Sequence, residues 1–264
     1  MKKYLFLLGV LFSVSNLFAI EPLLFKPLVG NTFEPRVGTI YNIDDEKLRL
    51  DIGTSIDLST LHKTDSSEVR LGGDFFTYTR LRSVGHFKFP VEASDYFFGA
   101  NVSGKTYLME QPFEWRVRLA HISAHLVDGY ASDSVFLQRP FSYSREFIEA
   151  IGAVRYKNVR FYGGTTFIFS TLPKNLGKWV PQFGFDGEYK FWRNLYLSYG
   201  YDYKISRIKK ITKLNATGQL GVIFKSTMKT GIGFYIYNHN GWNEHGMFYD
   251  KKLNYTGIGF QLIF

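Results

Sequence analysis

The stretch that decides the fold runs from Val180 to Phe191 and reads Val-Pro-Gln-Phe-Gly-Phe-Asp-Gly-Glu-Tyr-Lys-Phe. Its aromatic residues all stand at odd positions, whereas its charged residues, Asp186, Glu188 and Lys190, all stand at even ones. Successive side chains of a β-strand point to opposite faces, so this spacing gives one aromatic face and one polar face. The stretch therefore predicts a strand that lies between an apolar and a polar environment.

The same alternation recurs along the chain in about twelve segments, each long enough for a tilted spanning strand. The segments are 36–42, 47–58, 68–80, 93–106, 113–126, 143–156, 158–170, 180–191, 194–204, 214–224, 229–237 and 253–264. We predict an all-β fold, a single antiparallel transmembrane β-barrel of about 12 strands over residues 20–264. Its last strand closes the barrel and ends at Phe264. A soluble sandwich would have the same period, so composition and export must decide between the two.

Composition favours the membrane. The chain holds 26 Phe, 18 Tyr and 25 Gly, and aromatic residues suit both strands and membrane interfaces. Charged residues interrupt every apolar run, which excludes a helical membrane protein. The absence of cysteine excludes a disulfide scaffold. The net charge of +9 indicates attraction to anionic outer-membrane lipids and lipopolysaccharide, and no nucleic acid partner is expected.

The N-terminus has the layout of a signal peptide, which we assign to residues 1–19. Lys2 and Lys3 precede an apolar run over 4–14, and a short polar exit leads to Ala19. The run is shorter than the roughly 20 residues that a spanning helix needs. We therefore expect export to the bacterial outer membrane, with loops exposed at the cell surface. A terminal aromatic such as Phe264 resembles the signal that the barrel-insertion machinery recognises, so this machinery is an expected partner during biogenesis.

The links between strands are expected to alternate in length, as in barrels whose two ends both lie in the periplasm. Tight links are predicted at 157–158, 192–193 and 225–228, and longer outer loops at 171–179, 205–213 and 238–252. In the last loop Asn240-Gly241 is expected to form a turn. Charges of both signs point inward on several strands, which predicts a narrow lumen that is filled by paired charges and disfavours a wide porin. These charges are Arg70, Asp74, Glu114, Arg116, Arg118, Asp186, Glu188 and Lys190.

The segment 113–126 carries the candidate chemistry. Its outward face is apolar at first and then continues as His121, Ser123 and His125. As the fifth strand it places these side chains near the outer leaflet, where polar groups facing lipid need an interfacial depth or a function. A serine and a histidine on one face are the arrangement of a base-activated nucleophile. Pairing with the next strand, through the loop 127–141, would set Glu146 beside His121 and Ser144 beside Ser123, so that Glu146 orients the imidazole.

Other interpretations of these residues stay open. Interfacial His and Ser commonly hydrogen-bond lipid head groups or loop backbone. His121, His125 and Asp128 are an alternative metal-binding set, although their spacing is loose. Calcium is the cofactor to consider, with Asp128 and Asp133 as outer-loop ligands. The competing interpretation of the whole chain is a non-enzymatic surface protein: a structural protein, a small-solute channel or a host-binding adhesin.

Two resemblances bear on this choice. The string His121-Ile-Ser123 is similar to the His-x-Ser motif of the outer-membrane phospholipase A and lipid A deacylase families, which implies a lipid-facing catalytic pair; here Ala124-His125 follows, where those families have Asn-Gly or Asn-Ala. A longer resemblance, to a Gram-negative outer-membrane family of unknown function, implies a barrel and export. It covers Phe25–Leu28 with Glu34–Arg36, Phe89–Asp95, His121–Asp128, Tyr143–Glu146, and Asn240-Gly241 through His245–Tyr249. We therefore expect a barrel that hydrolyses an ester of phospholipid or lipid A, with Ser123, His121 and Glu146 as catalytic residues.

Overall fold

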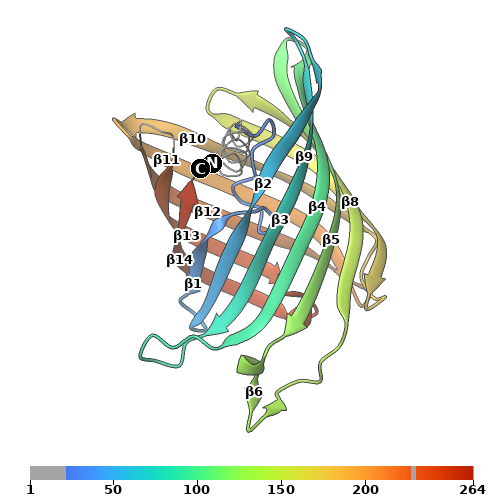
Figure 1. The fold of residues 1–264 in the computed structure, drawn as a ribbon, viewed down its shortest axis with the longest axis vertical. Coiled ribbons are helices and arrows are strands. Elements are labelled where there is room, and N and C mark those ends of the chain that lie inside the picture. Colours follow the sequence, from blue (N-terminus) through green and yellow to red (C-terminus); the bar gives the residue numbers. More distant parts are fainter. Residues whose placement is uncertain (1–21, 227–229, 264) are drawn as a thin grey trace, which may run out of the picture.

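A computed structural model describes residues 22–226 and 230–263; the predicted signal peptide and Phe264 lie outside these ranges. Within them, twelve strands close one antiparallel barrel in the order β1-β14-β13-β12-β11-β10-β9-β8-β5-β4-β3-β2 (Figure 1). The barrel strands are β1 (Val37–Asn42), β2 (Lys47–Lys63), β3 (Glu68–Arg82), β4 (Val91–Leu108), β5 (Gln111–Leu126), β8 (Tyr143–Tyr156), β9 (Val159–Leu172), β10 (Trp179–Trp192), β11 (Leu195–Ile208), β12 (Ile211–Lys225), β13 (Gly231–Trp242) and β14 (Lys252–Ile263). The predicted fold class and strand count are confirmed.

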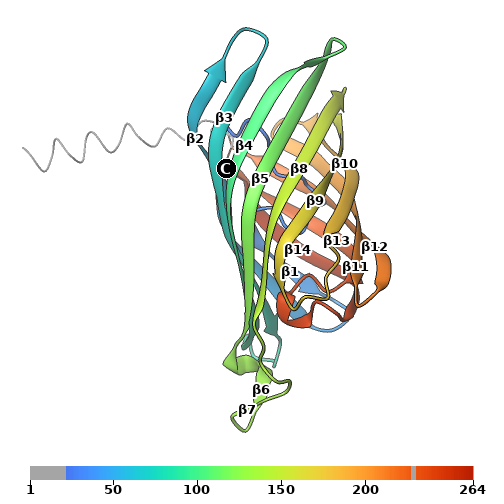
Figure 2. The ribbon, with the colours of Figure 1, turned by 90° about the vertical axis from the view of Figure 1, so that its right-hand side faces the viewer.

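The loop between β5 and β8 carries two short strands of its own, β6 (Ala131–Ser132) and β7 (Val135–Phe136), after the 3₁₀ turn η2 (Asp128–Tyr130). This hairpin projects from one end of the barrel (Figure 1). At the opposite end, the hairpins β2–β3 and β4–β5 rise above the other strands (Figure 2). No helix among the described residues is long and apolar enough to cross a membrane.

Two connections predicted from the sequence, a long loop and a turn, are wrong. The predicted long loop over 205–213 is a two-residue turn, because β11 and β12 stay paired up to Ile208 and Ile211. Lys209 and Lys210 both have positive φ, 48° and 71°, as a two-residue hairpin turn of the primed type requires. The polar sequence indicated a loop because a strand that runs past the apolar belt is free to carry charged residues on both faces.

The Asn240-Gly241 turn is also wrong, because β13 continues through both residues to Trp242 in register with β14. A glycine is needed at position 241 because a neighbouring side chain packs against its backbone. A Cβ on Gly241 would lie 2.4 Å from Oδ1 of Asn215, the atom that accepts the backbone N–H of Trp242 at 2.7 Å. The turn composition therefore reflects a close approach within the sheet.

The two faces of the strands have the predicted character. Outward aromatic residues such as Phe183 and Phe185 are exposed, whereas the inward Gln182 and Asp186 on the same strand are buried. Because the ladder satisfies the backbone groups of the closed sheet, such a barrel can present an apolar outer belt.

The lumen is filled by the chain itself, as the inward charges predicted. Residues 22–36 run inside the barrel, where Arg160 donates to the carbonyls of Lys26 and Pro27 at 3.0 and 3.1 Å. The carboxylate of Glu34 accepts from Arg116 and Arg118 at 2.5 and 3.1 Å. A buried charge is tolerated when it is paired and hydrogen-bonded, so this lumenal segment is anchored by ion pairs.

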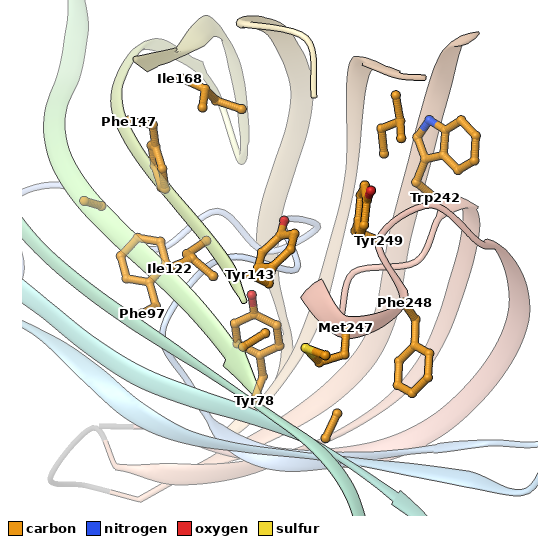
Figure 3. Close-up of a cluster of buried hydrophobic side chains, with 14 of the residues drawn as sticks. Tyr78, Phe97, Ile122, Tyr143, Phe147, Ile168, Trp242, Met247, Phe248 and Tyr249 are labelled. Atoms are coloured by element: carbon orange, nitrogen blue, oxygen red, sulfur yellow. The ribbon is translucent and has the colours of Figure 1, made fainter. Parts of the chain in front are cut away.

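A second segment also fills part of the barrel interior. The link 243–251 between β13 and β14 folds inward, with the 3₁₀ turn η3 (Gly246–Phe248) fully buried. Met247, Phe248 and Tyr249 join a cluster of aromatic and aliphatic side chains from the inner faces of β3, β4, β5 and β8 (Figure 3). The inward-folded loop is therefore part of the hydrophobic core.

Candidate functional site

The candidate site lies on the outer face of β5 and β8. On β5 the even residues Arg116 and Arg118 are buried in the lumen, and the odd residues face outward. The outward series passes from Val117 and Leu119, both exposed, to His121 and Ser123. The polar patch therefore begins where the exposed apolar series of this strand ends.

The register between β5 and β8 is the one that the sequence predicted. His121 lies opposite Glu146, and Ser123 lies opposite Ser144. Residues directly opposite on antiparallel strands have Cβ atoms about 5 Å apart, so their side chains are in contact range. The sheet thus brings all four residues into one outward patch.

Glu146 holds the imidazole of His121. Its Oε1 lies 2.9 Å from Nδ1 of His121, a hydrogen-bond distance. The side chains are 41% and 29% exposed, so the pair is accessible from the outer face. The other carboxylate oxygen, Oε2, is buried and has no hydrogen-bond partner in the described part of the chain. This contact places the proton on Nδ1 and leaves Nε2 as the basic nitrogen.

A bulge in the neighbouring strand marks the same position. Glu146 pairs with Ser170 and the next residue, Phe147, pairs with Ile168, so that β9 carries one extra residue, Phe169. β-Bulges bend a strand locally, and they are frequent beside active sites because they re-aim a side chain. The bulge lies directly beside the carboxylate of the candidate site.

Ser123 stands two residues from His121 on the same face, a rise of about 6.6 Å along the strand. No hydrogen bond joins the Ser123 hydroxyl to His121 within the described residues. Such contacts are often long in unliganded sites and shorten when substrate binds. The arrangement supplies a hydroxyl, an imidazole and a carboxylate on one surface.

The residues of the alternative metal site do not form a cluster of three in the described residues. No group of three or more His, Asp or Glu side chains among the residues in 22–226 and 230–263 is placed to hold a metal ion. His125 instead packs its ring against Tyr96, with centroids 6.0 Å apart. Asp128 begins η2, and Asp133 occupies the turn between β6 and β7 with φ of 49°.

Sequence reasoning missed a second histidine–carboxylate pair, inside the barrel. Nδ1 of His245 lies 2.8 Å from Oδ2 of Asp95, and Oδ1 of Asp95 accepts the backbone N–H of Gly246 at 2.7 Å. Both side chains are buried, and together they tie the inward-folded loop to β4. The signal for this contact was present, because both residues stand in stretches that carry the longer family resemblance.

Comparison with known proteins supports the barrel. The outer membrane phospholipase of Salmonella typhi, solved as a dimer with bound calcium, has a TM-score of 0.54 and 13% identity over 94% of this chain and 95% of that one. Outer membrane phospholipase A of Escherichia coli has a TM-score of 0.53 and 12% identity over 90% of this chain and 98% of its own. An active-site mutant of that enzyme gives 0.54 and 13%, over 95% and 96%. At these identities the likeness shows a shared fold.

Sequence comparison gives one family. A model described as a protein of unknown function, DUF1207, matches residues 84–264, more than half of the chain. No curated protein matches the chain. The matched region includes β5, β8 and therefore every residue of the outward patch.

Proposed function

Because the chain belongs to DUF1207, a family of proteins of unknown function, we propose its activity from its own site: it is an outer-membrane hydrolase of lipid acyl esters. The observation that carries the proposal is the 2.9 Å contact between His121 and Glu146, with Ser123 on the same outward face. These residues supply a nucleophile, a base and a group that orients the base, the arrangement of a serine-type acyl transfer. The substrate is a phospholipid or the ester-linked part of lipid A.

The chemistry follows from the tautomer. The carboxylate of Glu146 accepts a hydrogen bond from Nδ1–H of His121, so Nε2 takes the proton of Ser123 as the serine hydroxyl attacks the ester carbonyl. The alcohol part of the lipid leaves with that proton, and the acyl group stays on Ser123. Water, deprotonated by the same nitrogen, then releases the fatty acid. Glu146 stabilises the imidazolium that forms in both steps.

The location of the patch fits a lipid substrate. With β1 running outward from the periplasm, β5 also runs outward, and the patch lies toward the outer leaflet with the β5–β8 loop at the cell surface. An ester in the adjoining leaflet then reaches Ser123 from the side, without entering the lumen. The outer-membrane lipids and lipopolysaccharide are the partners in this proposal, and the barrel-insertion machinery acts during biogenesis.

The experiment measures fatty acid release by purified, refolded protein from phospholipid vesicles and from lipid A, with calcium and with chelator. Ser123→Ala removes the nucleophile and His121→Ala removes the base. Because the two residues act together, either change lowers kcat about 10³-fold or more. Glu146→Gln causes a smaller loss and shifts the pH profile. Ser94→Ala, an outward serine on the neighbouring strand β4, is the matched control and retains activity. Equal inertness of the wild type and Ser123→Ala in every condition refutes the proposal.

A second candidate is a non-enzymatic surface protein that binds through the β5–β8 loop. The observation in its favour is the exposed apolar tip of that loop, where Val135 is 69% and Leu137 58% exposed. Deleting the β6–β7 hairpin then removes binding to host surfaces, whereas Ser123→Ala leaves it unchanged. The filled lumen argues against the small-solute channel.

A further inference from the structure

A cavity of about 90 Å³ lies inside the barrel, apart from the outward patch. Its walls come from β8 to β13, from the two loops 173–178 and 243–251, and from the lumenal segment 22–36. Eight of the 20 lining residues are aromatic or aliphatic, and most of the others are polar; the eight are Phe33, Tyr143, Ile168, Leu176, Val180, Ile208, Trp242 and Tyr249. Four of them, Tyr143, Ile168, Trp242 and Tyr249, are labelled in Figure 3, where they point into the barrel interior.

Arg145 supplies a positive charge in this wall. Its guanidinium stacks over the rings of Phe33 and Phe147, with 4.7 and 5.6 Å between the guanidinium carbon and the centroids. Within the described residues it forms no ion pair, and its buried Nε has no hydrogen-bond partner. Arg116 and Arg118, which point inward from β5, are both bound to carboxylates. The Arg145 side chain is half-buried and has no counterion in the described residues, and an anion stabilises a partly desolvated guanidinium, so this one is suited to bind an anion.

The acidic groups of the wall are already neutralised. Asp202 pairs with Lys204 at 2.7 Å, and Glu244 pairs with Arg49 at 2.7 Å. Neither carboxylate is therefore free to serve Arg145. The indole Nε1 of Trp242 is a further donor in this wall that is buried and lacks a hydrogen-bond partner among the described atoms. Both donors belong to a wall that also carries eight aromatic or aliphatic side chains, so an acceptor with an apolar body fits this wall.

We propose that this cavity binds a small monocarboxylate with an apolar or aromatic body. A planar guanidinium recognises a carboxylate through paired hydrogen bonds. At 10–15 Å³ for each water-sized group, the cavity holds about six to nine such groups, the size of benzoate or a short-chain fatty acid. The nearby carboxylates of Asp202 and Glu244 favour a single negative charge over a dianion such as phosphate.

The test uses the full chain in detergent and titrates it calorimetrically with benzoate, with the uncharged benzamide and with inorganic phosphate. Arg145→Gln removes the charge and lowers benzoate affinity at least tenfold. Arg155→Gln is the matched control, since Arg155 stands on the same strand and away from the cavity, and it leaves the affinity unchanged. Ile168→Phe keeps the guanidinium but occupies the space, and it also abolishes binding. A heat-modifiability gel verifies that each variant forms the barrel.

Three results overturn the proposal. Benzamide that binds as tightly as benzoate removes the role of the charge, and unchanged benzoate affinity in Arg145→Gln removes the role of that residue. The absence of saturable benzoate binding at millimolar concentrations by the wild type removes the site. Tighter binding of phosphate than of benzoate overturns the carboxylate assignment. Because the cavity is separate from Ser123, Ser123→Ala leaves benzoate affinity unchanged whether or not the chain is a hydrolase.

Discussion

The ion-pair cluster at Glu34 gives a direct test of how the lumenal segment is held. Glu34 lies between Arg116 and Arg118, and all three side chains are at most 3% exposed. Glu34→Gln keeps the shape of the side chain and removes its charge, which leaves two buried guanidinium groups with one fewer counterion. Breaking a buried pair by removing one partner costs about 3–5 kcal/mol. Against a total stability of roughly 5–15 kcal/mol, that loss is large.

The assay is reversible urea unfolding of the barrel in lipid vesicles, followed by tryptophan fluorescence. The matched control is Glu188→Gln, because Glu188 pairs with Lys225 at the partly exposed rim of the barrel. A partly exposed pair contributes about 1 kcal/mol or less, so the control shifts the free energy of unfolding slightly. If Glu34→Gln destabilises the protein no more than Glu188→Gln does, the ion pairs do not hold the segment and the reasoning fails.

Two further predictions concern the β13–β14 region. Burial raises the pKa of Glu244, but Arg49 and two histidines lower it more, so that the pKa falls from the ordinary 4.5 to about 2. The ionised Glu244 therefore stabilises the fold by about 3 kcal/mol. This stabilisation is complete above pH 4.5 and is lost as the pH falls toward 2. The difference in unfolding free energy between the wild type and Glu244→Gln therefore shrinks over that window, and a constant difference contradicts the assignment. Gly241→Ala places a Cβ within 2.4 Å of Asn215 and lowers the free energy of unfolding in urea by about 1–3 kcal/mol. Gly163→Ala is the control and has little effect, because the nearest atom to its Cβ is 3.8 Å away. Equal effects at the two glycines would rule out the close-approach explanation.

The features predicted correctly are those that depend on period two and on adjacent strands. The pairing of His121 with Glu146 needs only the parity of two strands and the choice of one hairpin register, and a shift by one residue would turn every side chain to the other face. The sequence itself therefore allowed only a few pairing registers between these two strands. The catalytic roles of Ser123, His121 and Glu146 stay predictions, because they depend on chemistry that geometry alone does not test.

The contacts that were missed join residues far apart in the chain. Glu34 meets Arg118 across 84 positions, and His245 meets Asp95 across 150. No periodicity connects such residues, because the lumenal segment and the inward-folded loop have no regular pattern of their own. Parity predicted that Arg118 points inward and needs a partner, but it did not say which segment supplies the carboxylate. The cavity could not be predicted for the same reason, since its walls combine six strands, two loops and the lumenal segment.

The filled lumen constrains where any function can lie. Residues 22–36 run through the interior and the loop 243–251 packs into the core, so these two segments fill much of the lumen in the described part of the chain. The two proposed sites accordingly lie on the outer surface and in a small cavity. The two proposals assign different ligands to these places: a lipid ester to the surface patch and a small carboxylate to the cavity. The proposed chemistry on surrounding lipids needs the outward patch to be held in place, and the sheet does so because Glu146 and His121 lie opposite each other on adjacent strands.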